Sequence, residues 1–133
     1  MSEENVEIVR AQYAAFGRLD ADGIRSYVLS YFDPDCEYWP VEEIDAIRGH
    51  EALIEWIKRW LEAWSSFHSE VEEIIDAGEI VLAAVTSRAR GRSSGIETRE
   101  QWFDVYEMRE GRILRSREYL DRDSALEAAG LSE

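Results

Sequence analysis

The stretch QWFDVYEMREGRILRSREYL, residues 101–120, decides the fold, because apolar and polar residues alternate on both sides of a glycine-containing turn. A period of two is typical of a β-strand with one buried face. The stretch therefore predicts an antiparallel hairpin with strands over 97–108 and 112–121. A two-residue turn would force Glu110 to positive φ, whereas a three-residue loop over 109–111 asks this only of Gly111. We therefore expect the three-residue loop.

This loop sets the register of the hairpin, pairing Met108 with Arg112 and Asp104 with Ser116. One face then carries Trp102, Asp104, Tyr106, Leu114, Ser116 and Glu118. Asp104 and Glu118 become diagonal neighbours about 7–8 Å apart on a largely apolar face. Burial and mutual repulsion raise carboxyl pKa values, which can place a proton donor beside a base near neutral pH. Alternatively, Ser116, a tyrosine or a buried water satisfies the two acids, and they have no catalytic role.

The remaining elements predict an α+β fold, because helical periodicity comes first and strand periodicity follows from residue 67. Strands are expected over 67–76 and 79–90, with a short one over 36–39, so the sheet should be antiparallel. Helices are expected from Ser2, which can cap the first, over 24–32 and from His50 to Trp64. A short helix over 125–129, capped by Asp123 or Ser124, should end the chain. Residues 1–133 are expected to form a single domain.

Three tryptophans recur every fourth residue in EWIKRWLEAW, residues 55–64. On a helix this spacing aligns Trp56, Trp60 and Trp64 in one row. The row is typical of core packing against a sheet, but it also suits the wall of a pocket or an interface with a partner. If the helix covers the inner face of the sheet, the tryptophans would close a cavity above Asp104 and Glu118.

Composition and charge restrict the kinds of partner and cofactor that the protein is expected to bind. The net charge of −14 repels nucleic acid and anionic membranes, so neither is expected as a partner. Cys36 is the only cysteine, and the sequence has no leader-like or membrane-spanning apolar run, which indicates a cytoplasmic protein. His50 and His68 lack metal-ligand spacing, and no phosphate-binding glycine motif is present, so we expect no metal and no cofactor.

Four stretches together resemble the nuclear transport factor 2-like superfamily, and in particular its SnoaL-like branch. They are YFDPDCEYWP, IRGHEALIEWIKRWLEAW, RARGRSSG and EGRILRSREYLDRDSALEAAGL, and the resemblance covers about residues 5–131. It implies a cystatin-like, cone-shaped sheet packed against N-terminal helices, commonly as a homodimer. The superfamily includes polyketide cyclases, ketosteroid isomerases, epoxide hydrolases and non-catalytic binding domains.

The resemblance also bears on single residues. The protonated aspartate of ketosteroid isomerases falls on Asp104. Their tyrosine falls on Gln12, beside Tyr13, and their base falls on Pro40, close to Glu42 and Glu43. A carboxylate of limonene epoxide hydrolases falls on Glu118. The Arg and second Asp of those hydrolases fall on Val85 and Ser87, so their triad is absent.

We therefore expect a domain that binds a small apolar or polycyclic molecule, with Asp104 and Glu118 as an acid-base pair for an isomerase or cyclase reaction. The alternative is a non-catalytic ligand-binding or dimerisation module whose pocket its own tryptophans fill. The expected pocket residues are Tyr13, Phe16, Trp39, Trp56, Trp60, Trp102, Tyr106, Ser116 and Leu120. An exposed mixed surface around Phe103 and Val105, on the opposite face of the hairpin, is expected to form the homodimer.

Overall fold

The protein is described by a computed structural model that covers residues 2–41 and 45–131. Glu42 and Glu43 lie outside the described residues, and so does the side chain of Ser2, the expected first cap. The helices are α1 (Ser2–Gly17), the 3-10 turn η1 (Ala21–Gly23), α2 (Ile24–Tyr31), α3 (His50–Ala63) and α4 (Arg122–Ala128). The strands are β1 (Phe32–Trp39), β2 (Ile47–Arg48), β3 (Trp64–Ala77), β4 (Ile80–Gly91), β5 (Glu97–Arg109) and β6 (Arg112–Tyr119).

The strands form one six-stranded sheet in the order β2-β1-β6-β5-β4-β3, which confirms the predicted α+β class. Its pairs are antiparallel with one exception, because β1 runs parallel to β6. The expectation of a purely antiparallel sheet is wrong at this pair. Consecutive strands joined by a tight turn run antiparallel, but β1 reaches β6 only through β2, α3, β3, β4 and β5, so a tight turn does not dictate its direction.

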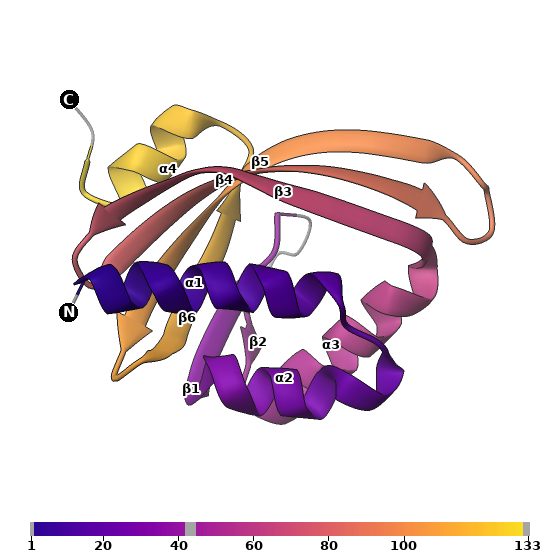
Figure 1. The fold of residues 1–133 in the computed structure, drawn as a ribbon, viewed down its shortest axis with the longest axis horizontal. Coiled ribbons are helices and arrows are strands. Elements are labelled where there is room, and N and C mark those ends of the chain that lie inside the picture. Colours follow the sequence, from indigo (N-terminus) through magenta and orange to yellow (C-terminus); the bar gives the residue numbers. More distant parts are fainter. Residues whose placement is uncertain (1, 42–44, 132–133) are drawn as a thin grey trace.

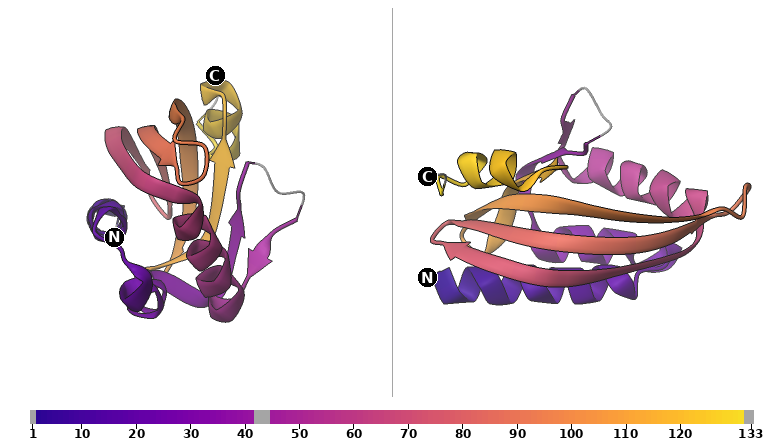
Figure 2. Two further views of the ribbon diagram at one scale, coloured as in Figure 1. Left: turned by 90° about the vertical axis from the view of Figure 1, so that its right-hand side faces the viewer. Right: turned by 90° about the horizontal axis from the view of Figure 1, so that it is seen from above.

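The sheet curves around α1, and α4 lies on its opposite side (Figure 1). In the two further views, α2 and α3 close the concave side below the curved strands, and the β4–β5 hairpin projects beyond the helices (Figure 2). The main core lies between these helices and the concave face, and it includes Val9, Val28, Leu53, Val81 and Ile113. The concave face is called the inner face below, and the face under α4 the outer face.

Helix α3 begins at His50, directly after Gly49, whose φ of 85° suits glycine, and it buries Leu53, Ile54 and Ile57. Trp56 and Trp60 lie on this helix as predicted. Trp64 does not, because its backbone is already extended (φ −119°, ψ 135°) and it begins β3. The tryptophan row therefore continues across the junction of a helix and a strand.

The β5–β6 turn differs from the expected loop. Arg109 pairs with Arg112 across a two-residue turn, in which Glu110 has a φ of 50° and Gly111 a φ of 80°. A bulge then pairs Met108 with Ile113 but Glu107 with Arg115. Two positive φ values match the right-handed twist of the strands, and this match outweighs the cost at Glu110.

The two-residue turn and the bulge together move the strand register by two residues. The same residues of β5 and β6 therefore lie on the inner face as predicted, but each pairs with a different partner. Tyr106 lies opposite Ser116, and Asp104 lies directly opposite Glu118 instead of diagonally from it. Near the turn, Ile113 takes the buried position expected for Leu114.

Helix α4 covers part of the outer face and is capped by Asp121, whose side chain accepts a hydrogen bond from the Ser124 amide at 2.8 Å. The expected caps, Asp123 and Ser124, lie inside the first turn. Phe103 packs beneath α4 against Ala125 and Ala129. Phe103 therefore does not belong to the exposed surface that was expected to form a dimer. None of the described helices is long and apolar enough to cross a membrane.

A half-exposed ion pair joins the start of β1 to the end of β5. Arg109 donates to both carboxylate oxygens of Asp33, at 3.0 and 2.8 Å. The Asp33 side chain is only 9% exposed, yet it lies near the surface under Arg109. The hydrogen bonds from Arg109 outweigh its modest desolvation, so the pKa of Asp33 is lowered.

Candidate active site

Strands β5 and β6 place two carboxyl groups side by side on the inner face. Asp104 and Glu118 are direct cross-strand partners, and such residues have Cβ atoms about 4.5–5.5 Å apart. Asp104 is 5% exposed, and its neighbours along the face are Trp102 and Tyr106. Placing two acids this close in an apolar setting requires other groups to stabilise them.

Asp104 is the end of a hydrogen-bonded relay that begins in α2. The Tyr27 hydroxyl donates to Gln12 Oε1 at 2.5 Å, and Gln12 Nε2 donates to the Tyr106 hydroxyl at 3.3 Å. Tyr106 donates to the Tyr13 hydroxyl at 2.7 Å and approaches Asp104 Oδ2 at 3.2 Å. Tyr13 in turn donates to Asp104 Oδ2. Side chains from α1, α2 and β5 thus hold one oxygen of this carboxyl in place.

The surroundings of Asp104 raise its pKa from 3.8 to about 7. Desolvation is the largest cause, and the negative charge of Glu118 is the second; the hydrogen bonds from Tyr13 and Tyr106 act in the opposite direction. The buried indole N–H of Trp102 also lowers the pKa of Asp104 from nearby, but it makes no hydrogen bond of good geometry to a described residue. Asp104 therefore holds or releases a proton close to neutral pH.

The hydrogen-bond donors to Glu118 differ from those to Asp104. The Tyr38 hydroxyl donates to Oε2 at 2.5 Å, and the Val41 amide donates to Oε1 at 3.1 Å. Burial raises the pKa of Tyr38, and the charge of Glu118 raises it further, so this tyrosine stays a donor. Burial likewise raises the pKa values of Tyr13 and Tyr106, with Asp104 adding to both.

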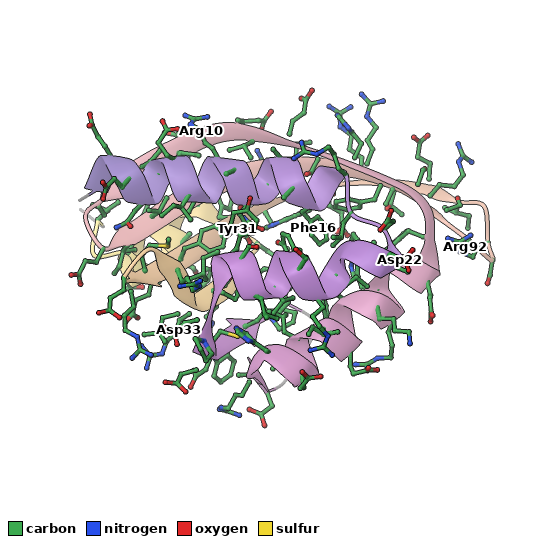
Figure 3. All side chains as sticks on the ribbon, turned by 60° about the horizontal axis from the view of Figure 1, so that its bottom comes forward. Arg10, Phe16, Asp22, Tyr31, Asp33 and Arg92 are labelled. Carbon is green, nitrogen blue, oxygen red and sulfur yellow. The ribbon has the colours of Figure 1, made fainter. Side chains whose placement is uncertain are left out.

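A cavity of about 490 Å³ opens above the two acids. Pockets that bind small molecules span roughly 300–1,000 Å³, so the space suits such a ligand. Its walls are largely aromatic: Trp56 stacks on Trp60 with ring centroids 6.5 Å apart, and Tyr38 meets Trp56 edge-on at 5.0 Å. Phe16 joins the wall from α1, and Figure 3 shows it between α1 and α2.

A second cleft of about 490 Å³ lies on the other side of this aromatic wall. Phe16, Trp60, Trp64 and Phe67 line both spaces. The second cleft contains no residue of the acid pair or of the relay. Arg92 lies beside it at the hairpin end of the molecule, where it donates to the carbonyls of Glu62 and Trp64 (Figure 3). The acid pair therefore lines the inner cavity and not the second cleft.

Most of the predicted pocket residues line the inner cavity. They are Tyr13, Phe16, Trp56, Trp60, Trp102, Tyr106, Ser116 and Leu120, together with Asp104 and Glu118. Leu120 lies at the rim, since it is 67% exposed.

The prediction that Trp39 lines the pocket is wrong. It pairs with Arg117 rather than with an inner-face residue, and the guanidinium groups of Arg48 and Arg117 lie 5.9 and 5.2 Å from its ring centroid. Its strand neighbour Tyr38 faces the cavity instead. The charged residues Asp35 and Glu37 share the parity of Trp39 along β1, whereas Cys36 and Pro40 are buried. That alternation is the signal that could have identified Tyr38.

Neither histidine belongs to the site. His68 is exposed on β3, and His50 Nε2 lies 2.8 Å from the carbonyl oxygen of Phe32. Within residues 2–41 and 45–131, no three His, Cys, Asp or Glu side chains are grouped so that they could hold a metal ion. The site consists of two carboxyls, their hydroxyl and amide donors, and an aromatic wall.

Comparison with known proteins agrees with this architecture. The sequence model of a family described as SnoaL-like domain matches residues 9–116. No match was found among the curated proteins. An NTF2-like protein of unknown function from Burkholderia pseudomallei is similar in structure, with a TM-score of 0.77 and 21% identity over 93% of this chain and 95% of the other.

Two further solved structures are similar in fold. A putative SnoaL-like polyketide cyclase from Jannaschia sp. has a TM-score of 0.76 and 16% identity, covering 99% of this chain and 94% of the other. A protein with a ketosteroid isomerase-like fold from Catenulispora acidiphila, solved in complex with trimethylamine, has a TM-score of 0.74 and 19% identity. The aligned region covers 94% of this chain and 93% of that protein.

Proposed function

Because the chain belongs to the SnoaL-like domain family, we propose that it binds a small, mostly apolar molecule in the inner cavity and moves a proton on it without a cofactor. The reaction is an isomerisation or a cyclisation. The observation that carries this proposal is the direct pairing of Asp104 and Glu118 on the floor of an aromatic cavity. Their different hydrogen-bonding environments suit them to different roles.

Asp104 is the proton donor. Its pKa of about 7 keeps much of the population protonated near neutral pH. Because Oδ2 accepts from the Tyr13 hydroxyl and lies beside that of Tyr106, the proton of Asp104 resides on Oδ1, from which it can be donated to an oxygen of the ligand. A donor in a desolvated site stabilises negative charge that develops on that oxygen.

Glu118 is the base. The donors Tyr38 and Val41 satisfy lone pairs of an ionised carboxylate, which is the form that accepts a proton. In the proposed step, Glu118 removes a proton from a carbon next to a ligand carbonyl while Asp104 donates to the carbonyl oxygen. Glu118 then returns the proton to a different carbon while Asp104 takes its own proton back from the oxygen, so the product is an isomer of the substrate and both carboxyls regain their starting states.

The aromatic wall supports an apolar or polycyclic ligand, since flat rings offer Trp56 and Trp60 extensive contact at low entropic cost. The trimethylamine complex of the Catenulispora neighbour supports small-molecule binding by this fold. A homodimer is part of the proposal. Its surface would be the outer face of β5 and β6 beside α4, where Val105, Arg115 and Arg117 remain on the side away from the cavity.

A second candidate function is a non-catalytic ligand-binding or dimerisation module. One observation favours this function. Trp60 packs against both Phe16 and Phe67, with centroid distances of 5.4 and 4.5 Å, so these side chains contact one another and fill space that a ligand would occupy. Such a protein would bind a ligand without exchanging its protons.

Deuterium exchange separates the two functions. The protein is incubated in deuterated buffer with a panel of cyclic β,γ-unsaturated ketones, and mass spectrometry measures deuterium uptake and isomerisation. Native mass spectrometry of the purified protein searches in parallel for a bound ligand. Catalysed exchange should fall by roughly 100-fold or more in Glu118→Gln and in Asp104→Asn. Glu70→Gln is the control, because Glu70 is an exposed carboxyl on β3 that does not line the cavity.

Binding without exchange in the unaltered protein would favour the module. Exchange that survives both substitutions would exclude Asp104 and Glu118 as the acid-base pair.

A further inference from the structure

The hydroxyl of Ser87 interrupts an apolar row on the floor of the cavity. Ala83, Val85, Ser87 and Ala89 alternate along β4 on the inner face, and all are buried. Ser87 is 6% exposed and lines the cavity, and its hydroxyl makes no hydrogen bond to any of the residues that the structure describes. The hydroxyl is therefore available to form a hydrogen bond with a water molecule or a ligand in the cavity, and apolar packing alone does not explain a serine here.

Ser87 lies far from the acid pair but in the same cavity. Asp104 pairs with Ala83, and Ser87 follows four residues later along β4, which corresponds to about 13 Å. Val85 and the ring of Trp102, which pair with each other, separate the two polar positions with mostly apolar surface, in which the indole N–H of Trp102 is the polar group. The cavity floor is therefore polar, then apolar, then polar.

Other polar groups gather at the Ser87 end. Ser69 and Glu100 are the direct cross-strand partners of Ser87, and both line the cavity. Nearer the hairpin tip, the indole N–H of Trp64 is buried, again with no hydrogen-bond partner within the described part of the chain. An indole N–H only donates and a hydroxyl both donates and accepts, so an oxygen atom satisfies either group.

We propose that Ser87 forms a second binding subsite, which recognises a hydroxyl or carbonyl oxygen at the far end of an elongated ligand. The ligand has one oxygen at the acid pair, an apolar middle that spans Val85 and Trp102, and a second oxygen at Ser87. A single small ring is too short to reach both ends. This inference rests on the proposed function for the acid end, but Ser87 determines specificity and takes no part in proton transfer.

A matched pair of probes tests the subsite. One is biphenyl with a hydroxyl group at one end, and the other is biphenyl with a hydroxyl at both ends; calorimetry or tryptophan fluorescence measures the two dissociation constants. One net hydrogen bond corresponds to roughly a tenfold change in affinity. The doubly hydroxylated probe should therefore bind about tenfold more tightly to the unaltered protein. In Ser87→Ala this ratio should fall to about one.

Ser116→Ala is the matched control, because Ser116 is a buried serine at the acid end of the same cavity. It should leave the ratio between the two probes unchanged. If the unaltered protein binds both probes equally, or if Ser87→Ala preserves the ratio, the subsite is refuted while the apolar cavity stands. If Ser116→Ala abolishes the ratio as completely as Ser87→Ala, recognition at Ser87 is refuted. If neither probe binds, the proposed function fails as well.

Discussion

Replacing Asp104 by Asn should change how stability depends on pH. The native state raises the pKa of Asp104 from 3.8 to about 7, so it binds this proton more tightly than the unfolded chain does. The free energy of unfolding therefore falls as the pH rises from about 4 to about 7. Each pKa unit corresponds to about 1.4 kcal/mol, which gives a loss of at most about 4 kcal/mol.

The asparagine side chain would carry no charge, and its carbonyl oxygen can still accept from Tyr13 and Tyr106. We expect Asp104→Asn to unfold with nearly the same free energy as the unaltered protein at pH 4. At pH 8 the variant should be more stable than the unaltered protein by about 1–3 kcal/mol, because it has no buried charge to desolvate. The gain is smaller than the full loss because an amide nitrogen replaces one carboxyl oxygen and its hydrogen bonding. Urea denaturation at several pH values, followed by tryptophan fluorescence, measures both quantities.

Asp33→Asn is a control of opposite sign. The pKa of Asp33 is lowered by Arg109, so its ionised form stabilises the fold above the unfolded-state pKa and this contribution disappears as the pH falls through the native value. Asp33→Asn should therefore destabilise the protein at pH 8 and much less at low pH. If the difference between Asp104→Asn and the unaltered protein is the same at pH 4 and pH 8, Asp104 is a solvated carboxyl and its role as a proton donor near neutral pH is refuted.

Three further predictions concern the turn, the ion pair and the assembly. Both turn positions have positive φ, so Glu110→Gly should stabilise the protein and Gly111→Ala should destabilise it. Chemical denaturation should give a change of roughly 1 kcal/mol for each, and a neutral Gly111→Ala would contradict the two-residue turn. Arg109→Gln should destabilise the protein at neutral pH because it leaves Asp33 without its cation, and acidification that protonates Asp33 should reduce this effect. Light scattering at tens of micromolar should give about twice the monomer mass, and a strict monomer would exclude the homodimer.

The inner face of the hairpin could be predicted even though its turn could not. The sequence pattern identifies which residues share a face because side chains alternate strictly along a strand. It does not specify the turn, since the preference of Glu110 for negative φ competes with the twist of two long strands. The turn and the bulge moved the pairing by two residues, an even number, so Asp104 and Glu118 stayed on the same face.

Long-range partners were beyond the sequence pattern. Gln12 and Tyr27 lie on separate helices, and their hydrogen bonds to each other and to Tyr106 depend on how α1 and α2 pack. The aromatic character of Trp39 suggests a pocket residue, but the acidic residues beside it that share its parity indicate the opposite face of β1. The parallel pairing of β1 with β6, likewise, follows from chain topology rather than from any local pattern.

The relay that ends at Asp104 has a direction, because Tyr27, Gln12, Tyr106 and Tyr13 each donate toward the next group. Their hydrogens are thus engaged within the protein, and the hydrogen that the relay's end presents to a ligand is the one on Asp104. Below the pKa of Asp104 the proposed site would recognise a ligand oxygen that accepts a hydrogen bond, and above it the same site would recognise an N–H or O–H group that donates one. Around pH 7 the proposed site would therefore change its preference from ligands that accept a hydrogen bond to ligands that donate one.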